Sequence, residues 1–283
     1  MANQDTAPPR IPKTIYQCVA RKASLPDHYA HNIERIKALN PDHRFTLFDD
    51  ADILDFIQLE FGTAYVDRFL SISEGYGAVK ADFFRYLLIY RHGGIYLDIK
   101  STVDVPFDRS LRNDDQFILS QLDNADPTKP FYKWGEFREL NHIPGGEYQQ
   151  WHVIAAPEHP FLSAVIALML ERIDTYTPWT TGFGHMGVMR TTGPVMYSQA
   201  IHPIRNAFPH RLVKDETEIG LRYSFLSGKH DHRDSNNHYG TSFRPVFQRR
   251  GPTAVVGSAY LAAQRGFQAT IRGPLRRALR RPA

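Results

Sequence analysis

Residues 77–98 constrain the fold of this chain more than any other segment. The first part predicts a helix over residues 77–91, because apolar side chains recur there at helical spacing. A pair of glycines then ends the helix, and residues 95–97 predict a short buried strand with Asp98 at its carboxyl end. Ligands of open α/β sheets bind outside those strand ends, so the segment predicts a binding site beside Asp98.

The flanking sequence alternates between predicted strands and predicted helices, which is typical of an α/β domain with a mostly parallel central sheet flanked by helices. The predicted strands are residues 14–19, 44–48, 116–120 and 151–156, and the predicted helices are residues 26–39, a stretch that opens at 49–50, and residues 157–176. Residues 182–193 are rich in glycine, and residues 229–241 are rich in polar side chains and histidine. Both of these segments are predicted to be loops.

Charge is distributed unevenly and divides the chain into two parts. Residues 249–283 contain eight arginines and no acidic residue. The other 26 of the 34 basic residues accompany 30 acidic ones, so residues 1–248 carry a net charge of −4. We therefore expect a folded domain over residues 1–248 and a basic, arginine-rich tail over residues 249–283.

The basic tail favours contact with an anionic membrane surface. A nucleic-acid enzyme usually carries its positive field across the folded body, so we expect no nucleic-acid partner. Tyr260, Leu261 and Phe267 are interspersed with the arginines, as in a basic amphipathic helix that lies on acidic lipid. A solvated terminus fits the same composition, and both interpretations stay open.

Targeting and redox features favour a cytoplasmic protein. Residues 1–13 lack the apolar core of a secretory signal, and the longest apolar run, at residues 161–170, is too short to span a bilayer. The single cysteine, Cys18, excludes an intrachain disulfide. We expect a cytoplasmic location with peripheral contact at the inner face of the membrane.

Three charged residues are predicted to meet at one edge of the sheet. Asp82 and Arg85 lie three residues apart on the predicted helix and so share a face. The strand then returns along that helix and carries Asp98 to the same region. Carboxylates accept hydrogen bonds from sugar hydroxyls or hold a divalent cation, and a guanidinium donates to hydroxyls and phosphates. The combination predicts a nucleotide-sugar site, although an Asp/Arg pair alone is more often a surface ion pair.

Residues 81–85 (Ala-Asp-Phe-Phe-Arg) and 93–98 (Gly-Gly-Ile-Tyr-Leu-Asp) resemble the core of glycosyltransferases with a DXD sugar-binding region, the family 32 type. That family includes the yeast mannosyltransferase that initiates outer chains and bacterial capsular-polysaccharide transferases, and the glucosylating clostridial toxins are more distant. The similarity spans about residues 11–243 and also includes residues 11–17, 155–160, 192–194 and 238–243.

The resemblance implies a GT-A-type nucleotide-sugar-binding fold. It also implies a retaining hexosyltransferase, which moves a hexose from a UDP- or GDP-sugar to a glycan or lipid-linked acceptor in polysaccharide or glycoconjugate synthesis. The donor-binding residues that it implies are Gln17, Asp82, Arg85, Asp98 and Ser242. The resemblance implies catalytic roles for Asp82 and Asp98, and a Mn²⁺ or Mg²⁺ ion would bind Asp98 with His238 as a further candidate ligand. Lys100 is a third candidate catalytic residue, on the strength of its own charge.

Lys100 departs from the family pattern, because it stands where the second acid of the DXD motif is expected. A protonated lysine repels a divalent cation, so the metal requirement is doubtful. Three interpretations stay open: the ammonium replaces the metal at the leaving diphosphate, the metal persists on Asp98 and His238, or the site binds a nucleotide-sugar as an inactive partner protein. The strand alternation expected at this point predicts that Lys100 and Asp98 face the same side.

Overall fold

A computed structural model of the chain describes residues 10–129, 131–226 and 239–267. Its central sheet has six strands in the order β2-β1-β3-β6-β5-β7, of which five run in one direction and β6 runs opposite. The strands are β1 (Thr14–Cys18), β2 (Arg44–Phe48), β3 (Gly94–Leu97), β5 (Phe117–Ser120), β6 (His152–Ala155) and β7 (Arg211–Val213). This mostly parallel sheet confirms the predicted fold class.

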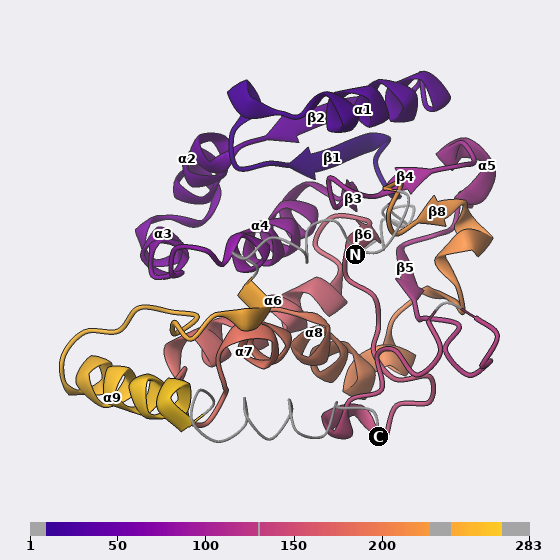
Figure 1. Cartoon of the computed structure of the whole chain (residues 1–283). Coiled ribbons are helices and arrows are strands. Elements are labelled where there is room, and N and C mark those ends of the chain that lie inside the picture. The colour runs from indigo at the N-terminus through magenta and orange to yellow at the C-terminus, as the bar shows by residue number, and fades with distance from the viewer. Residues whose placement is uncertain (1–9, 130, 227–238, 268–283) are drawn as a thin grey trace, which may run out of the picture.

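Helices cover both faces of the sheet, and the strands place alternate side chains in two cores. Ile95 and Leu97 of β3 lie in the smaller core, together with Ile36 of α1 (Asp27–Leu39). Tyr96 lies in the larger core, which includes α4 (Gly77–His92) and α6 (Pro160–Asp174). Figure 1 shows α1 on one side of the sheet and α4, α6 and α8 on the other.

The remaining elements lie around this sandwich. The α-helices are α2 (Asp50–Phe61), α3 (Thr63–Leu70), α5 (Phe107–Ser110), α7 (Gly184–Thr191), α8 (Pro194–Ile201) and α9 (Pro252–Phe267). The 3-10 helices are η1 (Lys22–Ser24), η2 (Arg138–Leu140), η3 (His202–Ala207), η4 (Glu216–Ile219) and η5 (Tyr239–Thr241), and β4 (Thr102–Val103) pairs with β8 (Leu221–Arg222). Within the described ranges, no helix has both the length and the apolar character needed to cross a bilayer.

Local sequence signals account for several element boundaries. Asp49 caps α2 by accepting hydrogen bonds from the backbone N–H groups of Ala51 and Asp52, and the Asp52 carboxylate accepts from the Asp49 N–H in return. Pro194 begins α8 directly after Gly193, as the sequence predicts. The strand expected at residues 44–48 has those bounds in the structure.

One element prediction is wrong, because the predicted loop at 182–193 contains helix α7. Gly187, inside this helix, is a packing residue rather than a loop residue. A Cβ on Gly187 would lie 2.7 Å from Cγ2 of Val246, so only glycine allows this close approach. Burial of Val188 and Met189 against the large core stabilises the helix despite its low intrinsic propensity.

The predicted basic tail begins with α9, which packs on the body of the protein. Leu261 is buried, and Gly257 lies against Pro178 and Trp179. Figure 1 shows α9 at the edge of the molecule, beside the helical layer that contains α7. A boundary between two domains at residue 248 stays a prediction.

Candidate active site

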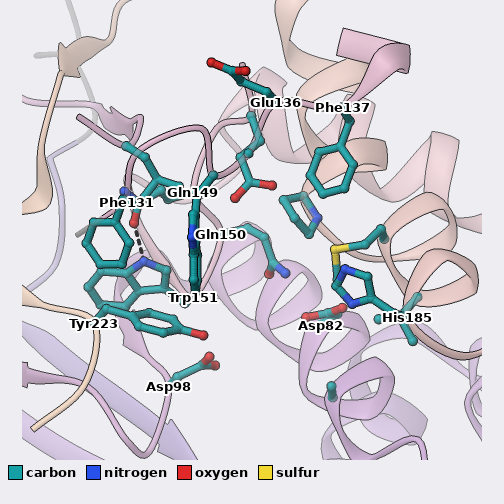
Figure 2. A pocket seen from close by; sticks show the side chains of 18 of the residues that line it. Asp82, Asp98, Phe131, Glu136, Phe137, Gln149, Gln150, Trp151, His185 and Tyr223 are labelled. Carbon is teal, nitrogen blue, oxygen red and sulfur yellow. Dashed lines mark hydrogen bonds between the residues drawn. The ribbon is translucent and has the colours of Figure 1, made fainter. Parts of the chain in front are cut away.

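A pocket of about 500 Å³ lies where α4 meets the loop after β3. Asp82, Arg85, Asp98 and Lys100 all line it, so the charged residues chosen from the sequence share one cavity. Figure 2 shows Asp98 and Tyr223 on one side of the pocket and Asp82 and His185 on the other.

Arg85 joins the two predicted carboxylates. Its Nη2 lies 3.0 Å from Oδ1 of Asp82 and 2.9 Å from Oδ1 of Asp98. The side chains of Asp82 and Arg85 are each 3% exposed, whereas that of Asp98 is 22% exposed. Asp98 is therefore the carboxylate of this trio that can meet a ligand directly, and the pair behind it fixes its position.

The guanidinium of Arg85 is held on several sides. It lies 4.8 Å from the ring centroid of Tyr96, and Nη1 donates to Oε1 of Gln150 at 2.6 Å and to the backbone carbonyl of Gln150. Burial acts to lower the pKa of Arg85, but the carboxylates of Asp98 and Asp82 outweigh it and hold that pKa well above the ordinary value. Arg85 is therefore a fixed positive charge in the pocket floor.

Asp82 is occupied by protein partners on both oxygens. Oδ1 faces Arg85, and Oδ2 accepts a hydrogen bond from Oγ1 of Thr192 at 2.7 Å. Burial raises the pKa of Asp82 to about 6, against the opposing effects of Arg85 and Thr192. This arrangement suits Asp82 to orient Arg85.

Lys100 lies on the same pocket wall as Asp98, although not by strand alternation. The strand ends at Leu97, and residues 98–100 form a turn closed by a 2.8 Å hydrogen bond from the N–H of Ser101 to the carbonyl of Asp98. Nζ of Lys100 donates to Oη of Tyr223 at 2.6 Å and lies 4.0 Å from that ring's centroid. The ammonium is thus held at the lining of the pocket, which Asp98 also lines.

The other predicted donor ligands lie elsewhere. Gln17 is fully buried behind Asp98, where its Nε2 donates to the Asp98 carbonyl at 3.0 Å, and it is not among the residues that line the pocket. Ser242 also lies off the pocket lining and accepts from the N–H of Arg244 at 3.2 Å. The predicted metal ligand His238 lies outside the described residues.

The described residues do not fit a Mn²⁺ or Mg²⁺ site. In the ranges that the structure covers, no cluster of three or more histidine, cysteine, aspartate or glutamate side chains is arranged to hold a metal ion. Asp98 contacts Arg85, and Lys100 lines the same pocket, so two cationic groups oppose a divalent ion there.

Sequence reasoning missed the wall that the irregular segment 131–151 contributes. Its aromatic members on the pocket are Phe131, Trp134, Phe137 and Trp151, and Tyr223 from beyond β8 adds a fifth ring. Figure 2 shows the hydrogen bond by which Trp151 Nε1 donates to Gln149 Oε1. The segment has no helical or strand periodicity, and its density of aromatic side chains was the signal available in the sequence.

Comparison with known proteins agrees with the resemblance seen in the sequence. Residues 26–118 match the family described as "Glycosyltransferase sugar-binding region containing DXD motif". The chain is 27% identical to "Initiation-specific alpha-1,6-mannosyltransferase" of Schizosaccharomyces pombe over 68% of this chain and 48% of that protein. It is 26% identical to a "Mannosyl phosphorylinositol ceramide synthase" of Saccharomyces cerevisiae over 69% of this chain and 43% of that protein.

These matches confirm the recognition of a DXD-type glycosyltransferase domain. The chain spans about half the length of the relatives that it matches. Among solved structures, "PaToxG Glycosyltransferase" aligns with a TM-score of 0.47 at 16% identity, covering 69% of this chain and 71% of that chain.

Proposed function

Because the chain contains a glycosyltransferase domain of the DXD type, we propose that it transfers a hexose from a UDP- or GDP-sugar to a glycan or lipid-linked hydroxyl, with retention of configuration. The observation that carries this proposal is the Asp82–Arg85–Asp98 cluster, whose members all line one pocket. Asp98 would accept hydrogen bonds from donor hydroxyls, and Arg85 would hold it in place. The names of the matched mannosyltransferases support mannose as the first sugar to test.

Lys100 gives the site a cation of its own. A fixed positive charge beside the departing diphosphate stabilises the negative charge that develops as the sugar–phosphate bond breaks. The hydrogen bond from Lys100 to Tyr223 supports this role, because it keeps the ammonium at the pocket surface without a carboxylate partner at that contact. We therefore propose transfer that does not require an added metal ion.

A protein that binds the nucleotide-sugar without transferring it is the second candidate. The loss of the second DXD acid at Lys100 favours this alternative, because that acid is expected to ligate the catalytic metal in the family. The two candidates differ in turnover and agree in donor binding.

Donor hydrolysis by the full chain separates these functions. A panel of UDP- and GDP-sugars, including GDP-mannose, is incubated with the protein with and without EDTA. Turnover that survives EDTA supports Lys100 as the cation that takes the place of a metal ion. Turnover that is lost in EDTA indicates a metal held partly by residues outside those described. Tight nucleotide binding without turnover on any donor supports the binding protein and refutes the transferase.

Two substitutions test the residues themselves. We expect Asp98→Ala to abolish hydrolysis while leaving the fold intact, and Lys100→Asp to lose activity or to gain a metal requirement. Asp108→Ala is the control, because Asp108 is a 43% exposed acid paired with Lys13 away from the pocket. Retained activity in Asp98→Ala would remove that residue from the proposal, and an unchanged Lys100→Asp enzyme would place the lysine outside the reaction.

We also propose that α9 rests on an anionic membrane surface. Val255, Val256 and Phe267 are 71%, 54% and 48% exposed, and residues 252–264 carry no charged side chain. In the sequence, the arginines of residues 249–283 lie on both sides of this apolar stretch and no acid accompanies them, and anionic headgroups attract that positive charge.

Co-sedimentation with lipid vesicles tests this surface. We expect the chain to sediment with phosphatidylglycerol vesicles and not with phosphatidylcholine vesicles, and the paired change Val255→Asp and Val256→Asp to release it. Leu59→Asp is the matched control, since Leu59 is an 83% exposed leucine on α2. Equal sedimentation of all three proteins would refute the assignment to α9.

A further inference from the structure

Glu147 places a carboxyl group on the pocket wall contributed by residues 131–151. Its backbone N–H donates to the Gly135 carbonyl at 3.0 Å, and a Cβ on Gly135 would lie 2.6 Å from its Cγ. The side chain therefore packs tightly where it leaves the backbone. Within the described part of the chain, its carboxyl makes no hydrogen bond or ion pair.

The other acids of the pocket are already engaged or exposed. Asp82 and Asp98 both contact Arg85, and Glu136 is exposed to solvent. Glu147 thus differs from them in being a partly buried carboxyl without a cationic partner in the described structure. A carboxylate of that kind can accept a proton from a substrate.

The backbone ties Glu147 to the donor cluster. Gln150, three residues further along, accepts a hydrogen bond from Arg85, and the carbonyl of Trp151 accepts from the N–H of Asp98 at 2.8 Å. Three residues span about 10 Å at most when fully extended, so a sugar held at the Arg85 cluster lies within reach of this wall.

We propose that Glu147 binds the hydroxyl that attacks the donor sugar and accepts its proton. This inference rests on the proposed transferase function. The hydroxyl O–H bond breaks and its proton passes to the carboxylate, while the oxygen bonds to the anomeric carbon on the same face of the sugar ring from which the diphosphate departs, so that the configuration is retained. The bond from that carbon to the diphosphate breaks, and the nucleotide diphosphate leaves with the electron pair. The Glu147 proton is then released to solvent.

The electrostatic environment of Glu147 suits a base that works at neutral pH. Burial raises the pKa of Glu147 to about 7, which leaves a large share of the group ionised there while strengthening it as a proton acceptor. The ionised form accumulates as pH rises through that value, so the reaction rate should rise with it.

Hydrolysis of GDP-mannose, or of whichever panel donor the chain consumes, is transfer to water and needs the same proton acceptor. We compare wild type, Glu147→Gln and Glu147→Asp from about pH 5 to about pH 9. In Glu147→Gln, kcat should fall by roughly 10²-fold or more, and the acidic limb of the pH profile should disappear. Glu147→Asp should keep that limb at a reduced kcat, because the acid remains with a shorter reach.

Two controls separate this role from a structural one. Asp108→Asn changes a 43% exposed acid that does not line the pocket and should leave both the rate and its pH profile unchanged. The dissociation constant for GDP, or for the nucleotide of the donor consumed, should stay the same in Glu147→Gln. A wild-type rate or a retained acidic limb in Glu147→Gln overturns the inference about Glu147 and leaves the proposed function standing. A wild-type protein that consumes no donor overturns both the proposed function and this inference.

Discussion

Thr192→Val tests whether the hydroxyl of this residue stabilises a buried charge. The substitution keeps the shape of the side chain and removes the group that donates to Oδ2 of Asp82 at 2.7 Å. Thr192 is fully buried and Asp82 is 2% exposed, so water does not replace the lost donor. Hydrogen bonds to charged groups contribute about 1.5–3 kcal/mol, and we expect the free energy of unfolding to fall by that amount at about pH 8.

The effect should weaken in acid. The folded pKa of Asp82, about 6, lies above its ordinary value of 3.8, so the folded state binds this proton more tightly than the unfolded chain. Stability from this group therefore increases as pH falls through 6, by a total of about 3 kcal/mol once both states are protonated. The Thr192 hydroxyl stabilises a protonated, neutral carboxyl less than an ionised one. The decrease in the free energy of unfolding caused by Thr192→Val should therefore be only about 0.5–1.5 kcal/mol near pH 5.

Urea unfolding followed by tryptophan fluorescence measures both values by linear extrapolation. Thr191→Val is the matched control, because Thr191 is also fully buried but donates to the carbonyl of Gly187 at 2.7 Å. Thr191→Val should lower the free energy of unfolding by about 0.5–1.5 kcal/mol at both pH values, since no carboxylate is involved. If Thr192→Val loses as much stability near pH 5 as near pH 8, the reasoning about Asp82 is wrong.

Three further changes test the fold. Gly187→Ala should lower the free energy of unfolding by about 1–3 kcal/mol through the clash with Val246, while Gly266→Ala, which meets nothing within 4 Å, should be neutral or stabilising in urea titrations. Asp49→Ala should lower the free energy of unfolding by about 1 kcal/mol in thermal unfolding, and an unchanged value would mean that the cap does not stabilise α2. Arg85→Met should cost about 3–5 kcal/mol by leaving buried charge unpaired, and wild-type stability by circular dichroism would contradict the buried network.

Much of the fold could be predicted because its signals are local. Apolar spacing over residues 77–91 and the glycines after it define α4 and β3 within a few residues of sequence. Helix α7 escaped prediction for the opposite reason, since glycine is favourable there only because Val246 packs against it.

In the candidate site, too, the features set by local sequence could be predicted and those set by long-range contacts could not. The convergence of Asp82, Arg85 and Asp98 followed from one helix and the strand after it, which short-range geometry fixes. The roles of neighbouring groups did not follow, because Thr192 meets Asp82 across 110 residues and Tyr223 meets Lys100 across 123.

By itself, the sequence determined the α/β class, the helix–strand unit and the identity of the charged residues that it carries, because periodicity and capping act over a few residues. Tertiary structure alone decided that Gln17 is buried behind Asp98, that the aromatic segment 131–151 forms the pocket's other wall, and that Glu147 faces the cavity. Burial and partners set the protonation and availability of each group, and both depend on contacts between segments far apart in the chain.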